Sequence, residues 1–548
     1  MNFSTITRSL CLPLILAVSH ANDSPAPAPL PSLDQAIPPF VKTETAPHKQ
    51  VFPGGIRMAV STHSLTVQIH VNQGLNHLHG GWDYEAARHF AYAMRQDPDC
   101  LMAHWGMVMS LLSPNPETDP ARAAAIDRLI HLIESGRGTD LERGYAYGLL
   151  KYFEEGPQGA SIAFRKVADK FPREMQAAIF SALFHRGGYD DLGSPTADQE
   201  FAEKTLLSLI ERHPESTAPI NALLLIRAEA PDLSDSLHLA RKLCHMAPDY
   251  PPYYHILGHY EWLTGNHREA ASAFAKATTQ YRNWMTAENT TIADCPDWVR
   301  SECYRIIALA SQEEYEIALA AASQVASLPI PENRQLSHAS RTLWWDAKTL
   351  PARIGMRINT RESLTQALQS LPSTDITRNI RDQTLAYWWI DALRLAIDGK
   401  LQILNGDINQ ARDVANAITL HGEAMAKAQN QAAAKGDRSS WLRAFRALEV
   451  LASELRGEIA LAGPPHLRET AFNWFTSAAD RQLAEPMLMP PMILTPMATR
   501  LGQFHLQADR PQQAIEAFER ALARFPNDPS TSRDLATAKN AATTPAPP

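Results

Sequence analysis

From about Val67 to Lys539, apolar residues recur at helical spacing, in segments separated by glycine, proline and aspartate. Such segments predict short amphipathic helices, and no long run of β-branched residues competes with them. The chain has 548 residues, which is far more than one ordinary core needs. The pattern therefore predicts an all-α protein made of several domains or of one elongated array of repeats.

Small and aromatic residues keep a fixed register within these segments. The glycine and alanines of each set would lie where two antiparallel helices pack most closely, and the phenylalanine would fill the gap toward the next pair. Three sets show this register: Gly258, Ala270, Phe274 and Ala277; Gly74, Ala86, Phe90 and Ala93; and Gly502, Ala514, Phe518 and Ala521.

This register resembles the tetratricopeptide repeat, whose period is about 34 residues. Weaker copies fill the intervals, so we expect a right-handed α-solenoid of about eleven tetratricopeptide-like helical hairpins plus a closing helix. Two segments, VNQGLNHLHGGWDYEAARHFAYAMRQDPDCLMAHWGM and LGQFHLQADRPQQAIEAFERALARFPNDP, further resemble a family of large bacterial tetratricopeptide-repeat proteins, most without an assigned function. Members of that family often carry a centre similar to H-M-P-S-H, which aligns here with His255 to His259.

The N-terminus carries the pattern of a secretory signal. Arg8 precedes an apolar run from Leu10 to Val18, and a small-x-small cleavage pattern ends at Ala21. We expect residues 1–21 to be removed after about Ala21 and the protein to be periplasmic or secreted, with no membrane-spanning segment in the mature chain. The remaining divisions that we predict are a proline- and alanine-rich linker (22–64) that buries nothing, an N-terminal array (65–330), a C-terminal array continuous with it (331–541) and a disordered tail (542–548).

The net charge bears on the class of partner, and the cysteine spacing bears on which disulfides could form. The formal net charge is −8 and the basic residues are scattered, so nucleic acid is a poor partner. Cys295 and Cys303 would lie about 12 Å apart along one helix, too far for a disulfide. Whether any bridge forms among Cys100, Cys244, Cys295 and Cys303 is left open.

The resemblance implies that certain positions of each repeat face a concave groove. An aromatic and polar surface with few charges suits an extended peptide or a partner helix. We therefore predict a non-catalytic binding scaffold for a protein or peptide partner, with no catalytic residue, cofactor or metal. The predicted groove residues are His79, Trp105, Met109, His255, His259, Trp262, Gln503 and Gln507.

Two alternatives come from other classes of function. His255 and His259 lie four residues apart and could bind zinc as part of a metal protein or metal-dependent enzyme, although the segment between them lacks the glutamate of an H-E-x-x-H hydrolase. Trp105 and Trp262 could instead be stacking platforms for a glycan or small molecule. The plain structural alternative is that Trp105 packs between hairpins and that the two histidines are hydrogen-bonded interior residues.

Overall fold

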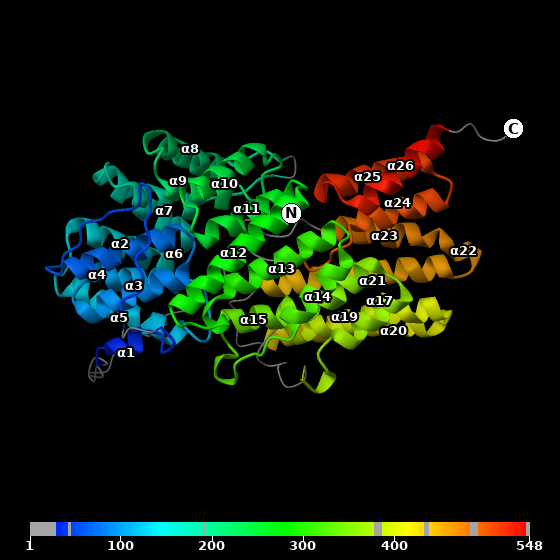
Figure 1. The fold of residues 1–548 in the computed structure, drawn as a ribbon, viewed down its shortest axis with the longest axis horizontal. Coiled ribbons are helices and arrows are strands. Elements are labelled where there is room, and N and C mark those ends of the chain that lie inside the picture. The colour runs from blue at the N-terminus through cyan, green and yellow to red at the C-terminus, as the bar shows by residue number, and fades with distance from the viewer. Residues whose placement is uncertain are drawn as a thin grey trace, which may run out of the picture. The chain divides into compact units, whose positions relative to one another are not determined.

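The computed structural model describes residues 29–41, 45–190, 193–376, 386–431, 438–482 and 491–543. The predicted signal peptide (1–21) and residues 544–548 of the predicted tail lie outside the described residues. Within those ranges every regular element is a helix, and only an isolated bridge between Tyr189 and Pro195 has β geometry (Figure 1). The predicted all-α class is therefore confirmed.

Consecutive helices pair into hairpins along the chain (Figure 1). The first pairs are α2 (Leu65–His79) with α3 (Asp83–Gln96), α4 (Leu101–Ser110) with α5 (Asp119–Glu134), the two halves of α6 (Asp140–Lys170), α7 (Met175–His185) with α8 (Ala197–Arg212), and α9 (Thr217–Ile226) with α10 (Ser234–Met246). The halves of α6 separate at Gly156, whose φ of 76° breaks the helix before Pro157.

The later pairs follow the same order. They are α11 (Pro251–Leu263) with α12 (His267–Ala287), α13 (Pro296–Ser311) with α14 (Tyr315–Ala326), α16 (Leu350–Ile358) with α17 (Arg361–Ser370), α19 (Ala386–Asn405) with α20 (Ile408–Gln431), α21 (Arg438–Ala462) with α23 (Thr470–Arg481), and α24 (Met497–Gln507) with α25 (Pro511–Arg524). Helix α26 (Pro529–Thr543) closes the series. Of the short α-helices, α1 (Leu33–Ala36) precedes the first pair, α15 (His338–Trp345) lies between two pairs, and α22 (Pro465–Arg468) lies in the connection between α21 and α23. The predicted series of hairpins with a closing helix is present.

Contacts between Cα atoms divide the chain into two compact units. Unit 1 comprises residues 1–253 and 286–290, and unit 2 comprises residues 254–285 and 291–548. The predicted boundary between residues 330 and 331 falls inside unit 2.

The close approach predicted between paired helices is present in both units. A methyl group added at any of the repeat glycines would lie less than 3.0 Å from a phenylalanine ring of the partner helix, closer than side chains pack. The glycine therefore makes room for the ring. The nearest distances are 2.7 Å for Gly74 with Phe90, 2.8 Å for Gly258 with Phe274, 2.5 Å for Gly502 with Phe518, and 2.5 Å for Gly457 with Phe475, a pair whose glycine the sequence pattern did not indicate.

Phe90 also joins neighbouring hairpins, as predicted for the aromatic position. Its side chain is fully buried in unit 1. A methyl group at Gly106, in the first helix of the next hairpin, would overlap the same ring that lies against Gly74. The ring thus fills the space between α2, α3 and α4.

The segment before α2 is packed, so the prediction that residues 22–64 bury nothing is wrong for the part that the structure describes. Ile56, Met58 and Val60 belong to the core of unit 1, as do Ile37 and Val41. Ile56, Met58 and Val60 alternate with the exposed Arg57 and Ala59, the period at which an extended chain turns one face to a core. The proline and alanine content of the region hides this short alternating pattern.

Side-chain amides of α2 hold this extended segment. Residues four apart on a helix are separated by about 6 Å, close to the 6.6 Å or so that separates alternate residues of an extended chain. One helix face can therefore bind successive inward peptide groups. The backbone N–H groups of Ile56, Met58 and Val60 donate to Asn76 Oδ1 (2.7 Å), Asn72 Oδ1 (3.0 Å) and Gln68 Oε1 (3.0 Å), while Asn76 and Gln68 donate back to the carbonyl oxygens of Ile56 (2.9 Å) and Met58 (2.7 Å).

The four described cysteines, Cys100, Cys244, Cys295 and Cys303, are all buried and free. The question left open by their spacing is answered: they form no disulfide with one another. Burial raises the pKa of the Cys100 thiol to about 12, so this group stays protonated at neutral pH.

Candidate functional site

The predicted groove residues of unit 1 lie in its interior. His79 Nε2 lies 3.1 Å from Gln176 Oε1, and the fully buried Trp105 donates its indole N–H to the carbonyl oxygen of Tyr145 at 3.0 Å. Met109 is buried as well. The structure therefore supports the interior interpretation of Trp105, and it removes this residue as a stacking platform for a glycan.

The chain's own extended segment packs against the same unit. Its residues lie across the first helices of successive hairpins, where the resemblance placed a groove. Ser61 donates its backbone N–H to Glu142 of α6 at 2.9 Å, and the sulfur of Met58 lies 3.7 Å from Gln176 Nε2 of α7. Phe52 packs edge-on against His77, with ring centroids 5.1 Å apart. The inner face of unit 1 is thus occupied by residues 48–61.

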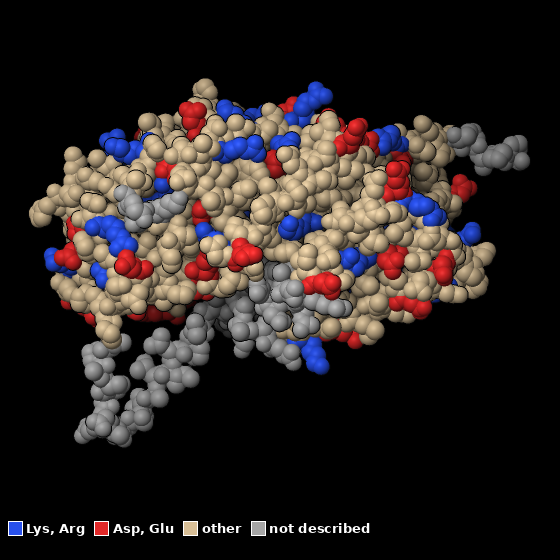
Figure 2. Space-filling view, turned by 60° about the horizontal axis from the view of Figure 1, so that its bottom comes forward, with Lys and Arg blue, Asp and Glu red and all other residues tan. Residues whose placement is uncertain are grey.

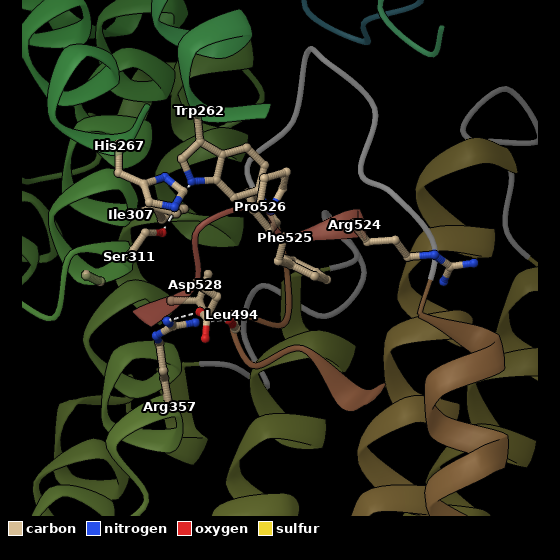
Figure 3. A pocket seen from close by; sticks show the side chains of 12 residues that line it. Trp262, His267, Ile307, Ser311, Arg357, Leu494, Arg524, Phe525, Pro526 and Asp528 are labelled. Atoms are coloured by element: carbon tan, nitrogen blue, oxygen red, sulfur yellow. Dashed lines mark hydrogen bonds and ion pairs between the residues drawn. The ribbon is translucent and has the colours of Figure 1, made fainter. Parts of the chain in front are cut away.

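Unit 2 contains a hollow that the sequence pattern did not reveal (Figure 3). It encloses only about 20 Å³ and opens to solvent, at the point where α11, α13 and α16 meet the turn between α25 and α26. We call it the unit 2 hollow. Its lining residues are Trp262, His267, Ile307, Ala310, Ser311, Arg357, Pro491, Leu494, Arg524, Phe525, Pro526 and Asp528.

Contacts between distant parts of unit 2 form this hollow. Asn527 donates its side-chain N–H to the carbonyl oxygen of Gly265 at 3.2 Å, across 262 positions of sequence. Gly265 has a φ of +79° and no room for a side chain, because its Cβ would lie 2.7 Å from the oxygen of Pro526. An ion pair of 2.5 Å between Arg533 and Glu313 lies in the same region. The first and last hairpins of unit 2 therefore meet, and repeat spacing alone gives no signal of this closure.

Trp262 is the predicted groove residue that lines the hollow. Its indole N–H donates to Ser311 Oγ at 3.3 Å, and its ring centroid lies 6.3 Å from that of Tyr304. Only 9% of the residue is exposed. Figure 3 shows the ring above the cavity, with Phe525 and Pro526 beside it. The indole is thus held in a fixed orientation with one part of its ring at the wall of the hollow.

A buried ion pair forms the floor of the hollow (Figure 3). Arg357 pairs with Asp528 at 2.5 Å and also donates to the backbone oxygen of Leu494. Burial alone would raise the pKa of Asp528, but Arg357 and hydrogen bonds from Thr531 outweigh burial and lower that pKa. The pair is therefore charged and internally neutralised at neutral pH.

Arg524 supplies the net charge of the hollow. Its guanidinium donates to the backbone oxygens of Ala479 and Gln482, and it forms no ion pair with any carboxylate in the described part of the chain. Burial and the neighbouring Arg520 lower its pKa, which nevertheless starts from the high value of arginine. Burial also lowers the pKa of His267, which is neutral at pH 7. The hollow therefore combines apolar walls with one cationic side chain.

The predicted histidine pair lies close to the hollow but not in its wall. His255 Nδ1 lies 2.8 Å from Ser301 Oγ, and the ring of His259 packs edge-on against Tyr304 with centroids 5.3 Å apart. Burial lowers the pKa of each histidine to about 3. No third described histidine, cysteine or carboxylate joins them as a potential metal ligand. The structure therefore gives no support to a metal centre at this pair.

The two predicted glutamines near the C-terminus are not part of the hollow. Gln503 donates to Asp534 of α26 at 2.8 Å, and Gln507 is exposed. The closing helix α26 packs against α24. Its Asp534 therefore binds the side chain of Gln503, which the repeat register had assigned to a groove.

The last helices of the chain match a known protein family. Residues 497–538, which form α24, α25 and most of α26, match the family model of the tetratricopeptide repeat. The chain carries a tetratricopeptide repeat. This match confirms the resemblance inferred from Gly502, Ala514 and Phe518. No curated protein matches the sequence.

Solved tetratricopeptide-repeat structures are similar over most of the chain's length. The TPR domain of P58(IPK) is 13% identical, with 87% of this chain and 98% of that chain covered and a TM-score of 0.20. Yeast Tom70 is 10% identical, with coverage of 87% and 88% and a TM-score of 0.26. The Cut9–Hcn1 assembly of APC/C is 13% identical, with coverage of 86% and 90% and a TM-score of 0.28. At these scores the whole chains do not superimpose, so the fold assignment rests on the hairpins and the repeat match.

Proposed function

We propose that this protein is a non-catalytic binding scaffold that holds a protein or peptide partner in the unit 2 hollow. Proteins built of tetratricopeptide repeats typically act as interaction scaffolds. The observation that carries the proposal is the composition of the hollow, whose walls are aromatic and apolar and whose lining includes the cationic side chain of Arg524. Pockets of this kind bind an apolar side chain and use a few polar groups to orient it.

The chemistry of the hollow specifies the partner's anchor. Trp262 and Phe525 offer aromatic surface next to Pro491 and Pro526, which suits an aromatic or large aliphatic side chain. The guanidinium of Arg524 is directed toward the end of α23, where it donates to two backbone oxygens, and its remaining N–H groups can bind a carboxylate beside the hollow (Figure 3). We therefore infer that the partner presents an extended segment in which an aromatic or large apolar residue lies next to an acidic residue or a C-terminal carboxylate.

The polar groups of the hollow support a binding role rather than chemistry. The hydroxyl of Ser311 accepts the indole N–H of Trp262, and Asp528 is held by Arg357. Both groups therefore take part in contacts that hold the walls of the hollow. In the described part of unit 2, the lining of the hollow offers groups that bind and orient.

Surface charge favours a protein over a nucleic acid as the partner. On the face drawn in Figure 2, acidic and basic side chains alternate, and the basic ones gather into no stripe. The net charge of −8 adds a general repulsion toward phosphate backbones. Among the described helices, none is both long and apolar enough to cross a bilayer. The signal pattern around Arg8 supports a partner in the periplasm or outside the cell.

A peptide display experiment tests the site. We expect the full chain to select peptides that carry an aromatic residue beside an acidic one, and Arg524→Glu to weaken their binding by roughly 10-fold to 100-fold because like charges then face each other. Arg268→Glu is the matched control, since Arg268 is exposed on α12 and does not line the hollow. Equal affinity of both variants for the selected peptides, measured by titration calorimetry, would remove the hollow as the binding site.

A further inference from the structure

A cluster of buried polar side chains lies in the first hairpin of unit 1. His77 is in the last turn of α2, and Glu85 and His89 lie one turn apart on α3. Each offers one ligand atom, and the three atoms lie within 4.8 Å of one another. All three side chains are buried, His89 completely. The hairpin turn therefore brings together two imidazoles and a carboxylate in the interior of the unit.

One ring nitrogen of each histidine has no hydrogen-bond partner. His77 Nδ1 lies 3.3 Å from Tyr250 Oη, and His89 Nδ1 lies 2.8 Å from His70 Nδ1. The other nitrogens, Nε2 of His77 and Nε2 of His89, are buried without a hydrogen bond in the described residues. Buried polar atoms normally have partners because leaving them unpaired is costly. Two such atoms on adjacent rings, whose centroids lie 5.1 Å apart, point to a missing common ligand.

The charges around the cluster favour a cation. Arg88 pairs with Glu85 Oε2 at 2.7 Å and with Glu288 Oε2 at 2.5 Å, so two carboxylates share this guanidinium, and the exposed His48 contacts Glu288 as well. The second oxygen of Glu85 lies 3.8 Å from His89 Nε2. A carboxylate away from water is stabilised by a nearby positive ion.

The histidines are also in the form that binds metal. Burial, together with Arg88, lowers the pKa of His77 to about 3. Burial and the neighbouring His77 lower the pKa of His89 well below its ordinary value, and the backbone of His48 opposes this only partly. Neutral imidazole offers a lone pair at each unprotonated nitrogen, so no proton has to leave a charged ring before an ion binds.

We propose that His77 Nε2, His89 Nε2 and the Glu85 carboxylate bind one divalent transition-metal ion, for which Zn²⁺ has the matching chemistry. Two imidazoles and a carboxylate form a donor set that Zn²⁺ accepts, with water as the fourth ligand. Metal–ligand bonds of about 2.0–2.2 Å require the ligand atoms to approach to roughly 3.5 Å of one another. The broad terminal torsion of histidine lets the rings turn toward a common point.

The ion would have a structural role. It connects the end of α2 to α3, the hairpin that contains Phe90 and to which the extended segment is bound. Because all three ligands are buried, no substrate reaches the ion through the described residues. If the ion has this role, metal binding raises the melting temperature of unit 1. We expect a rise of roughly 5 °C or more when the concentration of the free ion is about 100 times the dissociation constant.

Metal binding by the full chain, stripped with a chelator and reloaded with Zn²⁺ or Co²⁺, tests the proposal. We expect one ion per chain by elemental analysis, visible absorption bands of Co²⁺, and X-ray absorption of the Zn²⁺ form that shows imidazole nitrogens at about 2.0–2.1 Å. The unaltered chain decides the first question alone: a chain that binds neither ion, or binds them without imidazole ligands, overturns the proposal.

Variants then locate the ion. His77→Gln and His89→Gln are expected to lose the Co²⁺ absorption, and Glu85→Gln is expected to weaken binding at least 10-fold while its amide oxygen still accepts from Arg88. His104→Gln is the control for a buried histidine of unit 1 outside the cluster, and a His255→Gln, His259→Gln double variant is the control for the other histidine pair. Retention of metal by the His77 and His89 variants, or its loss only in the His255 and His259 variant, would overturn the assignment.

Discussion

Lowering the pH from 7 to 5 is expected to reduce the free energy of unfolding by about 2 kcal/mol for each histidine that is buried in its neutral form. The pKa is lowered by burial to about 3 for His77 and His259 and to about 4 for His79 and His104. In the unfolded chain these groups take up protons below about pH 6.5. Since the unfolded state then binds more protons than the folded state, stability is present above pH 6.5 and is lost as the pH falls toward 4.

The total effect is large because domains are usually stable by only about 5–15 kcal/mol. Carboxylates with lowered pKa values, such as Asp528 and Glu454, lose their contribution only below their ordinary values, so they do not act in this window. Urea unfolding at pH 7, 6 and 5, with a chelator present, measures the effect.

His259→Leu gives the matched test of this explanation. Both ring nitrogens of His259 lack hydrogen-bond partners among the described residues, so the substitution removes no hydrogen bond. We expect the variant to lose stability less steeply with acid than the unaltered chain, by up to about 1.4 kcal/mol per pH unit. Equal stability at pH 7 and pH 5 in the unaltered chain, or an unchanged slope in the variant, would contradict the assignment of neutral buried histidines.

Replacement of Phe90 by alanine is expected to lower the free energy of unfolding of unit 1 by about 3–5 kcal/mol. The ring is fully buried, and it lies against Gly74 and Gly106, which have no side chains that could fill the cavity. Ile162→Ala is the control, because Ile162 belongs to the same unit and is exposed. Denaturant unfolding followed by circular dichroism measures both variants. A loss for Phe90→Ala no larger than that for Ile162→Ala would show that the ring does not join the hairpins.

The repeat architecture could be predicted because its cause is local. Gly74 contacts Phe90 within one hairpin, and Gly258 contacts Phe274 in the same way. The residues that allow close packing therefore occur at a fixed spacing in the sequence. The interior of a hairpin is decided within about 34 residues of sequence. The helices, their pairing and the closing helix could therefore be predicted, and the family match at residues 497–538 agrees.

The candidate sites could not be predicted in the same way because they depend on contacts between distant segments. Trp262 was placed in a groove by its register, but Arg524 and Phe525 reach the same hollow only because Asn527 meets Gly265. Trp105, predicted to face a groove, is buried against Tyr145 and Phe180 of the following hairpins, and an extended segment in a proline-rich stretch packs against other inner helices of unit 1. Repeat register gives the direction of a side chain from its own helix and does not show what covers it.

The histidine cluster illustrates a second limit. His255 and His259 were candidate metal ligands because two histidines one turn apart on a single helix match a known ligand spacing. The cluster of His77, Glu85 and His89 is divided by a hairpin turn, so only the Glu85–His89 part has helical spacing. A search for Glu-x-x-x-His in the second helix, combined with a histidine at the end of the first, would have found it.

The central claim is that the unit 2 hollow is where the partner binds, and photo-crosslinking tests it most directly. A photoreactive phenylalanine analogue at position 525 lies in the wall of the hollow, whereas the same analogue at position 472 replaces an exposed phenylalanine of unit 2 that does not line it. With the peptides selected by display, the account predicts crosslinking from position 525 and none from position 472. Crosslinking from position 472 with none from position 525 would contradict it.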